Sequence, residues 1–347
     1  MRRALAVFLA FVAVSRAGEP PVMAVVESSL ATGSVQIRQF AFDGNPDTYF
    51  ASEKDAGKTD HFTVIFDKAV ALKSVIATTG KPAGGDALDT GMLEGSADGT
   101  KFEPLAQFAS GVAKASPAGK TVKALRIKPT DDIKHPLVIR EIAVESDPPV
   151  ATFRYPIEIS LDVTDAPEMK EWGEKVIRVC ERQYTMINDE LKSDGFKPRT
   201  TIAMRLKSDY NGVAAAGGGR ITGSVKFFKD HPDDIGAMVH ETVHVVQSYR
   251  TRGNPGWLVE GIADYIRFYR FEQDKQKPPT PERARYNGSY RVTARFLNYV
   301  ADKYDKELVR KLNKAMREGE YKPEIWKELT KKSVEELGDE WKESLKK

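Results

Sequence analysis

The chain has 347 residues, of which 41% are hydrophobic and 30% charged, so its composition is that of a globular protein and excludes intrinsic disorder for most of its length. This length exceeds the roughly 100–200 residues of a typical domain, and two domains are expected. Residues 1–17 contain Arg2, Arg3 and Arg16 and no acid, so the rest of the chain carries 50 basic and 50 acidic residues. A neutral chain has no general electrostatic reason to bind nucleic acid or an anionic membrane.

Residues 1–17 have the three parts of an export signal. A basic start is followed by an apolar run from Ala4 to Val14 and by the small residues Ser15 and Ala17. A membrane anchor is the alternative, but this run is much shorter than the roughly 20 residues that span a bilayer. No later stretch is apolar enough for an integral membrane span. We therefore expect a secreted or periplasmic protein.

Residues 22–147 consist of short β-rich runs between clusters of Gly, Pro, Asp and Ser. The runs are HFTVIFD, LKSVIATTG, VKALRIKP and LVIREIAVE. This pattern is typical of an all-β sandwich. The sequence Asp147-Pro148-Pro149 then interrupts it, and adjacent prolines stiffen the chain into an extended segment. We predict a linker at 148–150 and a second domain over 151–347.

The second half predicts an α+β domain. A strand in FRYPIEISLDV precedes a helix from about Pro167 to Leu191. Two strands follow in TTIAMRLKS and ITGSVKFF, joined by the glycine-rich turn GVAAAGGGR, and almost everything from Asp233 onward reads as helix. Near the end, Ser333 and Glu336 have the spacing of a capping box that starts a helix.

Cys180 is the only cysteine in the chain. A single cysteine excludes an internal disulfide, so stability must come from packed cores or a bound metal. Its setting, VIRVCERQY, is that of an amphipathic helix. We predict a buried structural thiol rather than a nucleophile.

The segment DDIGAMVHETVHVVQSY contains the H-E-x-x-H arrangement in His240, Glu241 and His244. Four residues turn a helix by about 400°, so both imidazoles project from one face, close enough to hold one Zn²⁺. Glu241 lies on the neighbouring edge, where it can reach a water on the metal rather than the metal itself. The alternative is an ordinary helix on which the pattern arose by chance and the histidines are only hydrogen-bonded.

A second acidic pair follows in NPGWLVEGIADYIRF. Pro255 and Gly256 predict a turn and Trp257 opens a helix, on which Glu260 and Asp264 share one face. A carboxylate from a second helix completes the His₂Glu set of a catalytic zinc, and we assign this role to Glu260. Asp264 can orient a ligating histidine. The alternative is a solvated face, but the flanking residues are apolar, and buried carboxylates need a metal or a cation.

The runs HETVHVVQSY, GWLVEGIADYIRF and YNGSYRVTARFLNYV resemble the basic secretory protein family, peptidases of plants and bacteria. The resemblance covers roughly Tyr155 to Leu345 and implies a zincin-like metallopeptidase domain. In zincins with a glutamate third ligand, the strand before the motif helix lies along the active cleft and pairs with extended peptide. Here that strand would be ITGSVKFF. The mature chain is neutral rather than basic, so a function tied to charge is not carried over.

The third run of this resemblance offers a donor for an oxyanion, which zinc hydrolysis needs. The candidates are Tyr286, Tyr290, Arg291 and Arg295, of which we prefer Tyr290. The alternative is a packing helix whose tyrosines only line the core.

The front domain resembles the discoidin or coagulation-factor C-type (F5/8 type C) sandwich in FAFDGNPDTYFAS, HFTVIFDKAVALKSV, LEGSADGTKFEPL and PLVIREIAVE. Members of that family often bind sugars, although no cluster of aromatic, Arg and His residues marks a sugar site here. The resemblance implies a structural Ca²⁺ at Asp43, Thr48 and Glu141, whose hard oxygens suit that ion. The alternative is an Asp-Gly-Asn turn without an ion. The sequence departs from the family at Phe50, where many members have tryptophan.

Our first hypothesis is therefore an exported zinc peptidase that acts on protein or peptide, with a front sandwich that attaches to glycan or a cell surface. His240, His244 and Glu260 hold the Zn²⁺, and Glu241 moves the proton from water to the leaving amine. A second hypothesis is a non-catalytic protein that binds glycan or the cell wall and whose zincin half is an idle scaffold. Glu241 argues against it, because a scaffold has no use for an acid beside the metal. A zinc hydrolase acting on another substrate class is the third.

Overall fold

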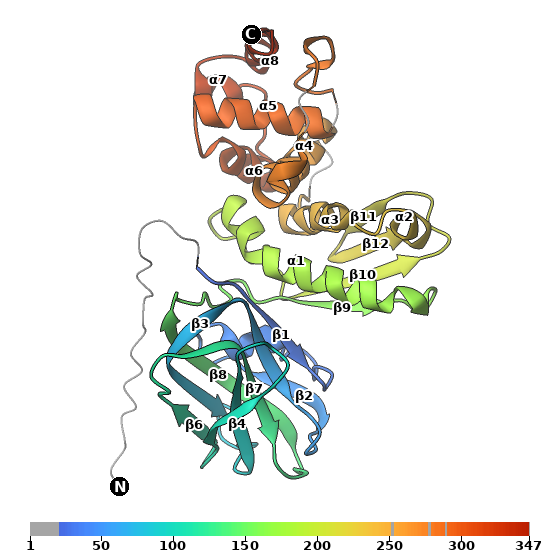
Figure 1. Cartoon of the computed structure of the whole chain (residues 1–347). Coiled ribbons are helices and arrows are strands. Elements are labelled where there is room, and N and C mark those ends of the chain that lie inside the picture. The colour runs from blue at the N-terminus through green and yellow to red at the C-terminus, as the bar shows by residue number, and fades with distance from the viewer. Residues whose placement is uncertain (1–20, 251–252, 277–278, 289, 347) are drawn as a thin grey trace. The chain divides into compact units, whose positions relative to one another are not determined.

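The structure is a computed structural model that describes residues 21–250, 253–276, 279–288 and 290–346. The chain divides into two compact units, one up to Glu158 and one from Ile159 onward (Figure 1). The export signal predicted at residues 1–17 lies outside the described residues.

The first unit is an antiparallel β-sandwich, as its short apolar runs predict. Its strands are β1 (Ala24–Ser28), β2 (Phe50–Asp55), β3 (Phe62–Thr79), β4 (Gly91–Ser96), β5 (Glu103–Gln107), β6 (Val112–Ala115), β7 (Lys120–Pro129) and β8 (Pro136–Asp147). A short 3₁₀ helix, η1 (Arg38–Phe42), precedes β2. The strand order is β2-β8-β3-β7-β4-β5, and β1 and β6 both pair with β3.

Strand β3 is a single strand of 18 residues, although its sequence reads as two separate runs. Its first part pairs with β1 and β7, and its later part pairs with β8 and β6. The register with β7 shifts between Ile65 and Val70. Such irregularities bend a strand, which is how one strand supplies partners to so many others. The core beneath it includes Phe50 and Phe62, whose ring centroids lie 4.9 Å apart.

The division between the units lies further along the chain than the predicted linker at 148–150. Val150 forms a parallel bridge with Val22. The backbone N–H of Phe153 donates to the carbonyl of Phe42 at 3.0 Å. Val150 and Phe153 both belong to the buried core of the sandwich. The Pro-Pro segment is therefore part of the first unit rather than a free joint.

The second unit contains a four-stranded sheet of order β11-β12-β10-β9. Its strands are β9 (Glu158–Asp162), β10 (Thr201–Lys207), β11 (Ala214–Gly217) and β12 (Arg220–Ser224). β12 pairs in parallel with β10 and antiparallel with β11, so β11 is an edge strand. The sequence predicted only a turn over residues 212–220, and this interpretation was wrong.

The predicted strand ITGSVKFF also ends earlier than expected. β12 stops at Ser224, whose hydroxyl accepts a hydrogen bond from the N–H of Phe227 at 3.3 Å. Serine is a favoured residue at a helix start, and a short helix, α2 (Val225–Asp230), begins there. The second half of the predicted strand is therefore helical.

Helices dominate the rest of the described second unit, as predicted from Asp233 onward. They are α1 (Lys170–Glu190), α3 (Ile235–Gln247), α4 (Gly256–Ile266), α5 (Tyr290–Lys303), α6 (Leu308–Glu318), α7 (Ile325–Thr330) and α8 (Val334–Ser344). The capping box predicted at Ser333 and Glu336 is present at the start of α8. Trp326 and Trp341 are buried beside Phe296 in the core that these helices enclose.

Cys180 lies on α1 and is fully buried. Burial raises the pKa of its thiol to about 12. The burial predicted for this thiol is confirmed, and a buried thiol is a poor nucleophile.

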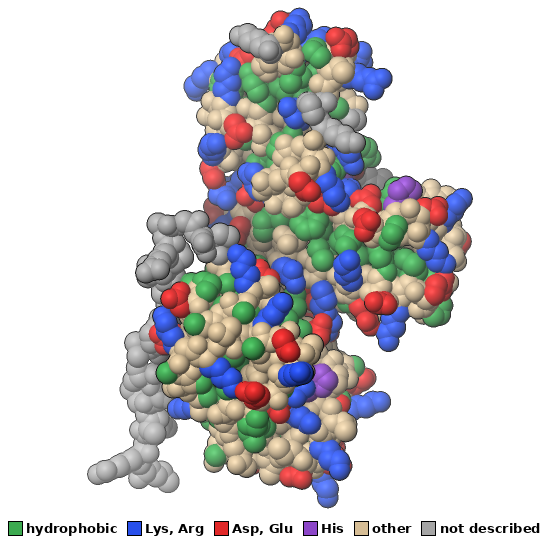
Figure 2. Space-filling view, in the orientation of Figure 1, with side chains coloured by type: hydrophobic (Ala, Val, Ile, Leu, Met, Phe, Trp, Pro, Cys, Tyr) green, Lys and Arg blue, Asp and Glu red, His purple; other side chains and the backbone are tan. Residues whose placement is uncertain are grey.

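The surface carries both signs of charge. Lys and Arg side chains alternate with Asp and Glu over the face seen in Figure 2. This mixing agrees with the equal numbers of basic and acidic residues outside the leader. In the described part of the chain, no helix is both long and apolar enough to cross a membrane.

Candidate metal centre

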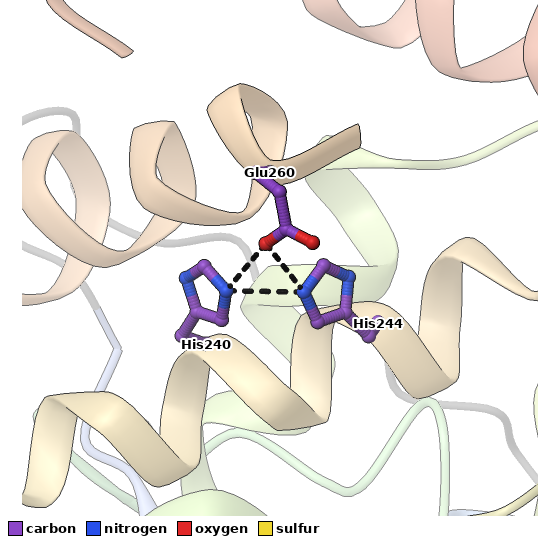
Figure 3. A group of neighbouring side chains, drawn as sticks. All are labelled: His240, His244 and Glu260. Carbon is purple, nitrogen blue, oxygen red and sulfur yellow. Dashed lines mark hydrogen bonds and ion pairs between the residues drawn. The ribbon is translucent and has the colours of Figure 1, made fainter. Parts of the chain in front are cut away.

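Three side chains from two helices converge in the second unit (Figure 3). His240 and His244 project from one face of α3, and Glu260 comes from α4. The Nε2 atoms of the two histidines lie 3.0 Å apart, and each lies 3.1 Å from Oε2 of Glu260. Among the described residues, this is the group of three His, Cys, Asp or Glu side chains with the spacing of metal ligands.

The donor set fits a zinc ion. Two imidazole nitrogens and one carboxylate oxygen are the protein ligands of a catalytic zinc, which leaves a fourth position open. Neighbouring ligand atoms in such a tetrahedral site lie about 3.3 Å apart. The three donor atoms here are 3.0–3.1 Å from one another, so a small shift would accommodate the ion.

Each histidine is oriented by a hydrogen bond at its other ring nitrogen. Nδ1 of His240 donates to Oδ1 of Asp264 at 2.7 Å, as expected from the sequence. Nδ1 of His244 donates to Oε1 of Gln247, also at 2.7 Å, and Nε2 of Gln247 donates to the carbonyl of Val259 at 2.9 Å. Such bonds select the tautomer in which Nε2 of the neutral imidazole is free to coordinate. The sequence analysis missed Gln247, although it follows His244 by three residues and so shares its side of the helix.

The electrostatics of the metal-free triad are strongly coupled. Burial alone would lower the pKa of His240, but its hydrogen bonds to Asp264 and Glu260 raise it to about 9. Burial would raise the pKa of Glu260, whereas its bonds to both histidines lower it to about 2. Both shifts favour an ion pair between the His240 imidazole and the Glu260 carboxylate. Because a ligating imidazole must be neutral, a metal would compete with this proton for the site.

Glu241 lies beside the triad but is not part of it. Its side chain is buried on α3 and lines the same cleft. Burial raises the pKa of its carboxyl group, while the charges of the two histidines and a hydrogen bond from the backbone N–H of Ala216 oppose that rise. A carboxylate held next to a metal triad, with an elevated pKa, is suited to accepting and returning a proton.

The triad opens into a cleft of about 900 Å³. Strand β11, from Ala214 to Gly217, lines the cleft and is the edge strand of its sheet. The resemblance to zincins had implied that ITGSVKFF would lie along the cleft. That strand, β12, is occupied on both sides by β10 and β11 and has no edge to offer. The Ala-Gly strand β11 takes this position instead.

The four candidates for an oxyanion donor are placed differently. Tyr290 lines the cleft, is half exposed, and has its ring centroid 6.0 Å from that of His240. Tyr286 packs against Trp257, and its hydroxyl faces Glu335. Arg291 lies over the ring of Phe268, and Arg295 lines a different pocket. Only Tyr290 of the four is near the triad.

In the first unit, the residues that the resemblance assigned to calcium lie together. The hydroxyl of Thr48 donates to the carboxylate of Asp43 at 2.9–3.0 Å. Burial, together with the nearby charge of Asp43, raises the pKa of Glu141 to about 8, and burial raises that of Asp43 to about 6. Oε2 of Glu141 is buried without a hydrogen-bond partner in the described structure. A partly buried carboxylate pair with an unpartnered oxygen fits a hard cation.

Residues 167–341 match the BSP family, described as peptidase of plants and bacteria. The match covers half of the chain and includes both helices that carry the triad. The chain therefore belongs to this peptidase family. No curated protein matches it.

Solved structures resemble about a third of the chain. One is CBM32-1 of a family 31 glycoside hydrolase from Clostridium perfringens, with 19% identity and a TM-score of 0.31, covering 35% of this chain and 92% of that one. The family 32 CBM of C. perfringens NanJ in complex with galactose has 14% identity, a TM-score of 0.30 and the same coverages. A fucose binding module of Streptococcus pneumoniae, SpX-3, has 16% identity, a TM-score of 0.30 and again the same coverages.

Proposed function

We propose that this protein is an exported, zinc-dependent peptidase. The observation that carries the proposal is the convergence of His240, His244 and Glu260 within 3.1 Å of one another, with Glu241 in the same cleft. Membership of a peptidase family gives the reaction class. The edge of β11 beside Glu241 offers backbone groups to an extended peptide, and extended peptides bind proteins by adding a strand in this way.

A zinc ion on the triad would polarise the scissile carbonyl and lower the pKa of water at the site. Glu241 accepts the proton of that water and passes it to the leaving amine. Asp264 and Gln247 hold the two imidazoles in the tautomer that presents Nε2. Tyr290, at the rim of the cleft, is the candidate for donating to the oxyanion.

The alternatives are weaker on the same geometry. An idle scaffold would not require a carboxylate buried beside the triad and hydrogen-bonded to the edge strand, as Glu241 is. A hydrolase for another substrate class would not need an edge strand along the cleft. Binding of glycan by the first unit stays a prediction of the sequence resemblance.

Metal analysis and a digest of a broad peptide library test the proposal directly. The purified protein is expected to carry about one zinc per chain and to cut peptides internally. Cleavage should stop in a chelator and return when zinc is added. A protein with bound zinc that cuts no peptide in the library would contradict peptidase activity and favour the non-catalytic hypothesis.

Replacing Glu260 and Asp264 separately distinguishes a ligand from an orienting residue. Glu260→Ala removes one of three donor atoms and is expected to empty the site. Asp264→Ala removes only the acceptor for Nδ1 of His240, and losses of this kind weaken metal affinity by about 10–100-fold. A competitive chelator titration measures both. Asp264 would be the ligand instead if its variant lost zinc more completely than Glu260→Ala.

Export is supported by the sequence of residues 1–17, with its arginines, apolar run and small residues. We propose that this leader is removed and that the mature protein acts outside the cytosol.

We also propose that the first unit binds a structural Ca²⁺ through Asp43, Thr48 and Glu141. Excess Ca²⁺ is expected to raise the unfolding temperature of this unit, with a stabilisation of about 3 kcal/mol at a hundredfold excess over Kd. Glu141→Gln should remove the response and, in calcium-free buffer, should not destabilise, because it replaces a partly buried acid whose Oε2 has no partner in the described structure.

Calorimetry and tryptophan fluorescence together assign this effect to one unit. All four tryptophans belong to the second unit, so their fluorescence reports its unfolding alone. Calcium should shift a calorimetric transition and leave the fluorescence midpoint where it was. Identical calorimetric scans with and without calcium would show that the loop at Asp43 is a plain turn.

A further inference from the structure

The cleft holds two arginines that the mechanism does not use. Arg199 and Arg250 are exposed and line the cleft, and neither has an acidic partner among the residues that the structure describes. The third arginine of the cleft, Arg267, is different because it pairs with Asp234 and Glu272. Two guanidinium groups are therefore available to a ligand.

Arg199 is fixed at the end of the edge strand. Its carbonyl accepts a hydrogen bond from the hydroxyl of buried Tyr184 at 3.0 Å. Its guanidinium lies against Gly219, where a Cβ atom would come within 3.0 Å of Cζ and Nη1. Gly219 also has a φ of +80°, which disfavours other residues. The glycine turn that follows β11 thus leaves room for this side chain.

Helices α1 and α3 run in the same direction. Cys180 of α1 has its thiol within hydrogen-bond reach of Thr242 on α3. Further along both helices, Arg317 donates to the carbonyl of Leu191, just beyond α1, and to that of Val246 on α3. The C-terminal end of α1 therefore lies beside the C-terminal end of α3.

This direction places both free arginines at one end of the cleft. Tyr184, which holds Arg199, comes one turn after Cys180 and so is level with the C-terminal half of α3. Arg250 comes directly after α3, two residues beyond the helix cap at Ser248. The basic end of the cleft thus lies beyond the C-terminus of the motif helix.

The acidic side chains of the cleft do not pair with these arginines, because each already has a partner at or beside the triad. Glu260 bonds both histidines, Asp264 bonds His240, and Glu241 accepts from Ala216. A guanidinium group pairs best with a carboxylate, which it binds through two parallel hydrogen bonds. A ligand that fills the cleft would place a carboxylate here.

We propose that Arg199 and Arg250 select peptides with a carboxylate at this end of the cleft. The proposal rests on the peptidase function proposed above. Because both arginines lie at one end, the preference falls on one side of the scissile bond only. The carboxylate can come from an internal Asp or Glu side chain or from the C-terminus of the peptide, and the test separates these sources.

The test compares matched peptides that differ only by Glu or Gln at successive positions around the cleaved bond. Each is made with a C-terminal amide and with a free carboxylate. We expect the wild type to prefer Glu in the amidated series by about tenfold in kcat/KM, the sum of two exposed ion pairs. The preference should shrink as salt rises, because salt screens exposed charges.

Variants identify the residues responsible. Arg199→Gln and Arg250→Gln should each reduce the Glu-to-Gln ratio, and the double variant should bring it to about one, with zinc content unchanged. Arg205→Gln is the matched control, because Arg205 is exposed on β10, pairs with Asp162 and does not line the cleft. A preference only for the free C-terminus, lost in the double variant, would assign the arginines to the terminal carboxylate.

Peptide-binding measurements test the carboxylate preference separately from the peptidase activity. Anisotropy of labelled Glu and Gln peptides, measured on Glu241→Gln protein, reports selection without turnover. If the wild type cuts no peptide, a Glu preference in binding that both arginine variants abolish would still support the carboxylate site. Equal binding and equal cleavage of all the peptides would overturn it and leave the peptidase function standing.

Discussion

Replacing Glu241 with glutamine is expected to lower kcat by about 10²–10⁴-fold while zinc content and fold stay intact. The carboxylate is outside the triad, so its loss removes no ligand. Glutamine has the same shape and keeps an oxygen that can accept from the N–H of Ala216, but its amide cannot take a proton at ordinary pH. Steady-state kinetics on a peptide from the library digest, with zinc measured on the same sample, checks this.

Glu174→Gln is the matched control for this variant. Glu174 is exposed on α1 and does not line the cleft, so the same substitution there should leave kcat unchanged. Glu241→Gln protein that retains zinc and works within a few-fold of the wild type would exclude Glu241 as the base.

Replacing His244 with alanine is expected to abolish both zinc binding and cleavage. The remaining donors, His240 and Glu260, are too few for a stable catalytic site, and the hydrogen bond to Gln247 is lost as well. Elemental analysis should find about one zinc per wild-type chain and almost none in the variant.

His231→Ala serves as the control for general effects of losing a histidine. His231 stacks on Phe227 at the end of α2 and does not line the cleft. This variant should bind zinc like the wild type. Equal zinc content in the wild type and in His244→Ala would contradict the ligand set described here, whatever the activity.

The local spacing of the sequence predicted much of the site. Four-residue spacing on a helix fixes which side chains share a face, so His240 with His244, and Glu260 with Asp264, could be paired without knowing the fold. The short connection between these two apolar helices favoured packing of the histidine face against the carboxylate face. Which of Glu260 and Asp264 would approach the histidine Nε2 atoms depends on how α3 and α4 cross, and that packing is not encoded in spacing.

Other parts of the site follow from tertiary pairing and could not be predicted. Residues Ala214–Gly217 have weak strand propensity, and they form β11 because β12 offers a partner. The sequence therefore suggested a turn. The helix at Val225 could have been expected from Ser224 as its cap. The later domain division reflects Val150 and Phe153, whose apolar side chains join the core of the sandwich despite following two prolines.

Some of the contacts between α3 and α4 lie outside the three donor atoms. Gln247 links His244 on α3 to the backbone of Val259 on α4 through two hydrogen bonds. Apolar side chains of both helices, such as Val243 and Ile262, are fully buried. Zinc fingers, by contrast, are unfolded until the ion binds. We therefore expect loss of the metal and loss of the fold to be separable events. A chain held together by such contacts is able to complete its folding first and to acquire a metal afterwards.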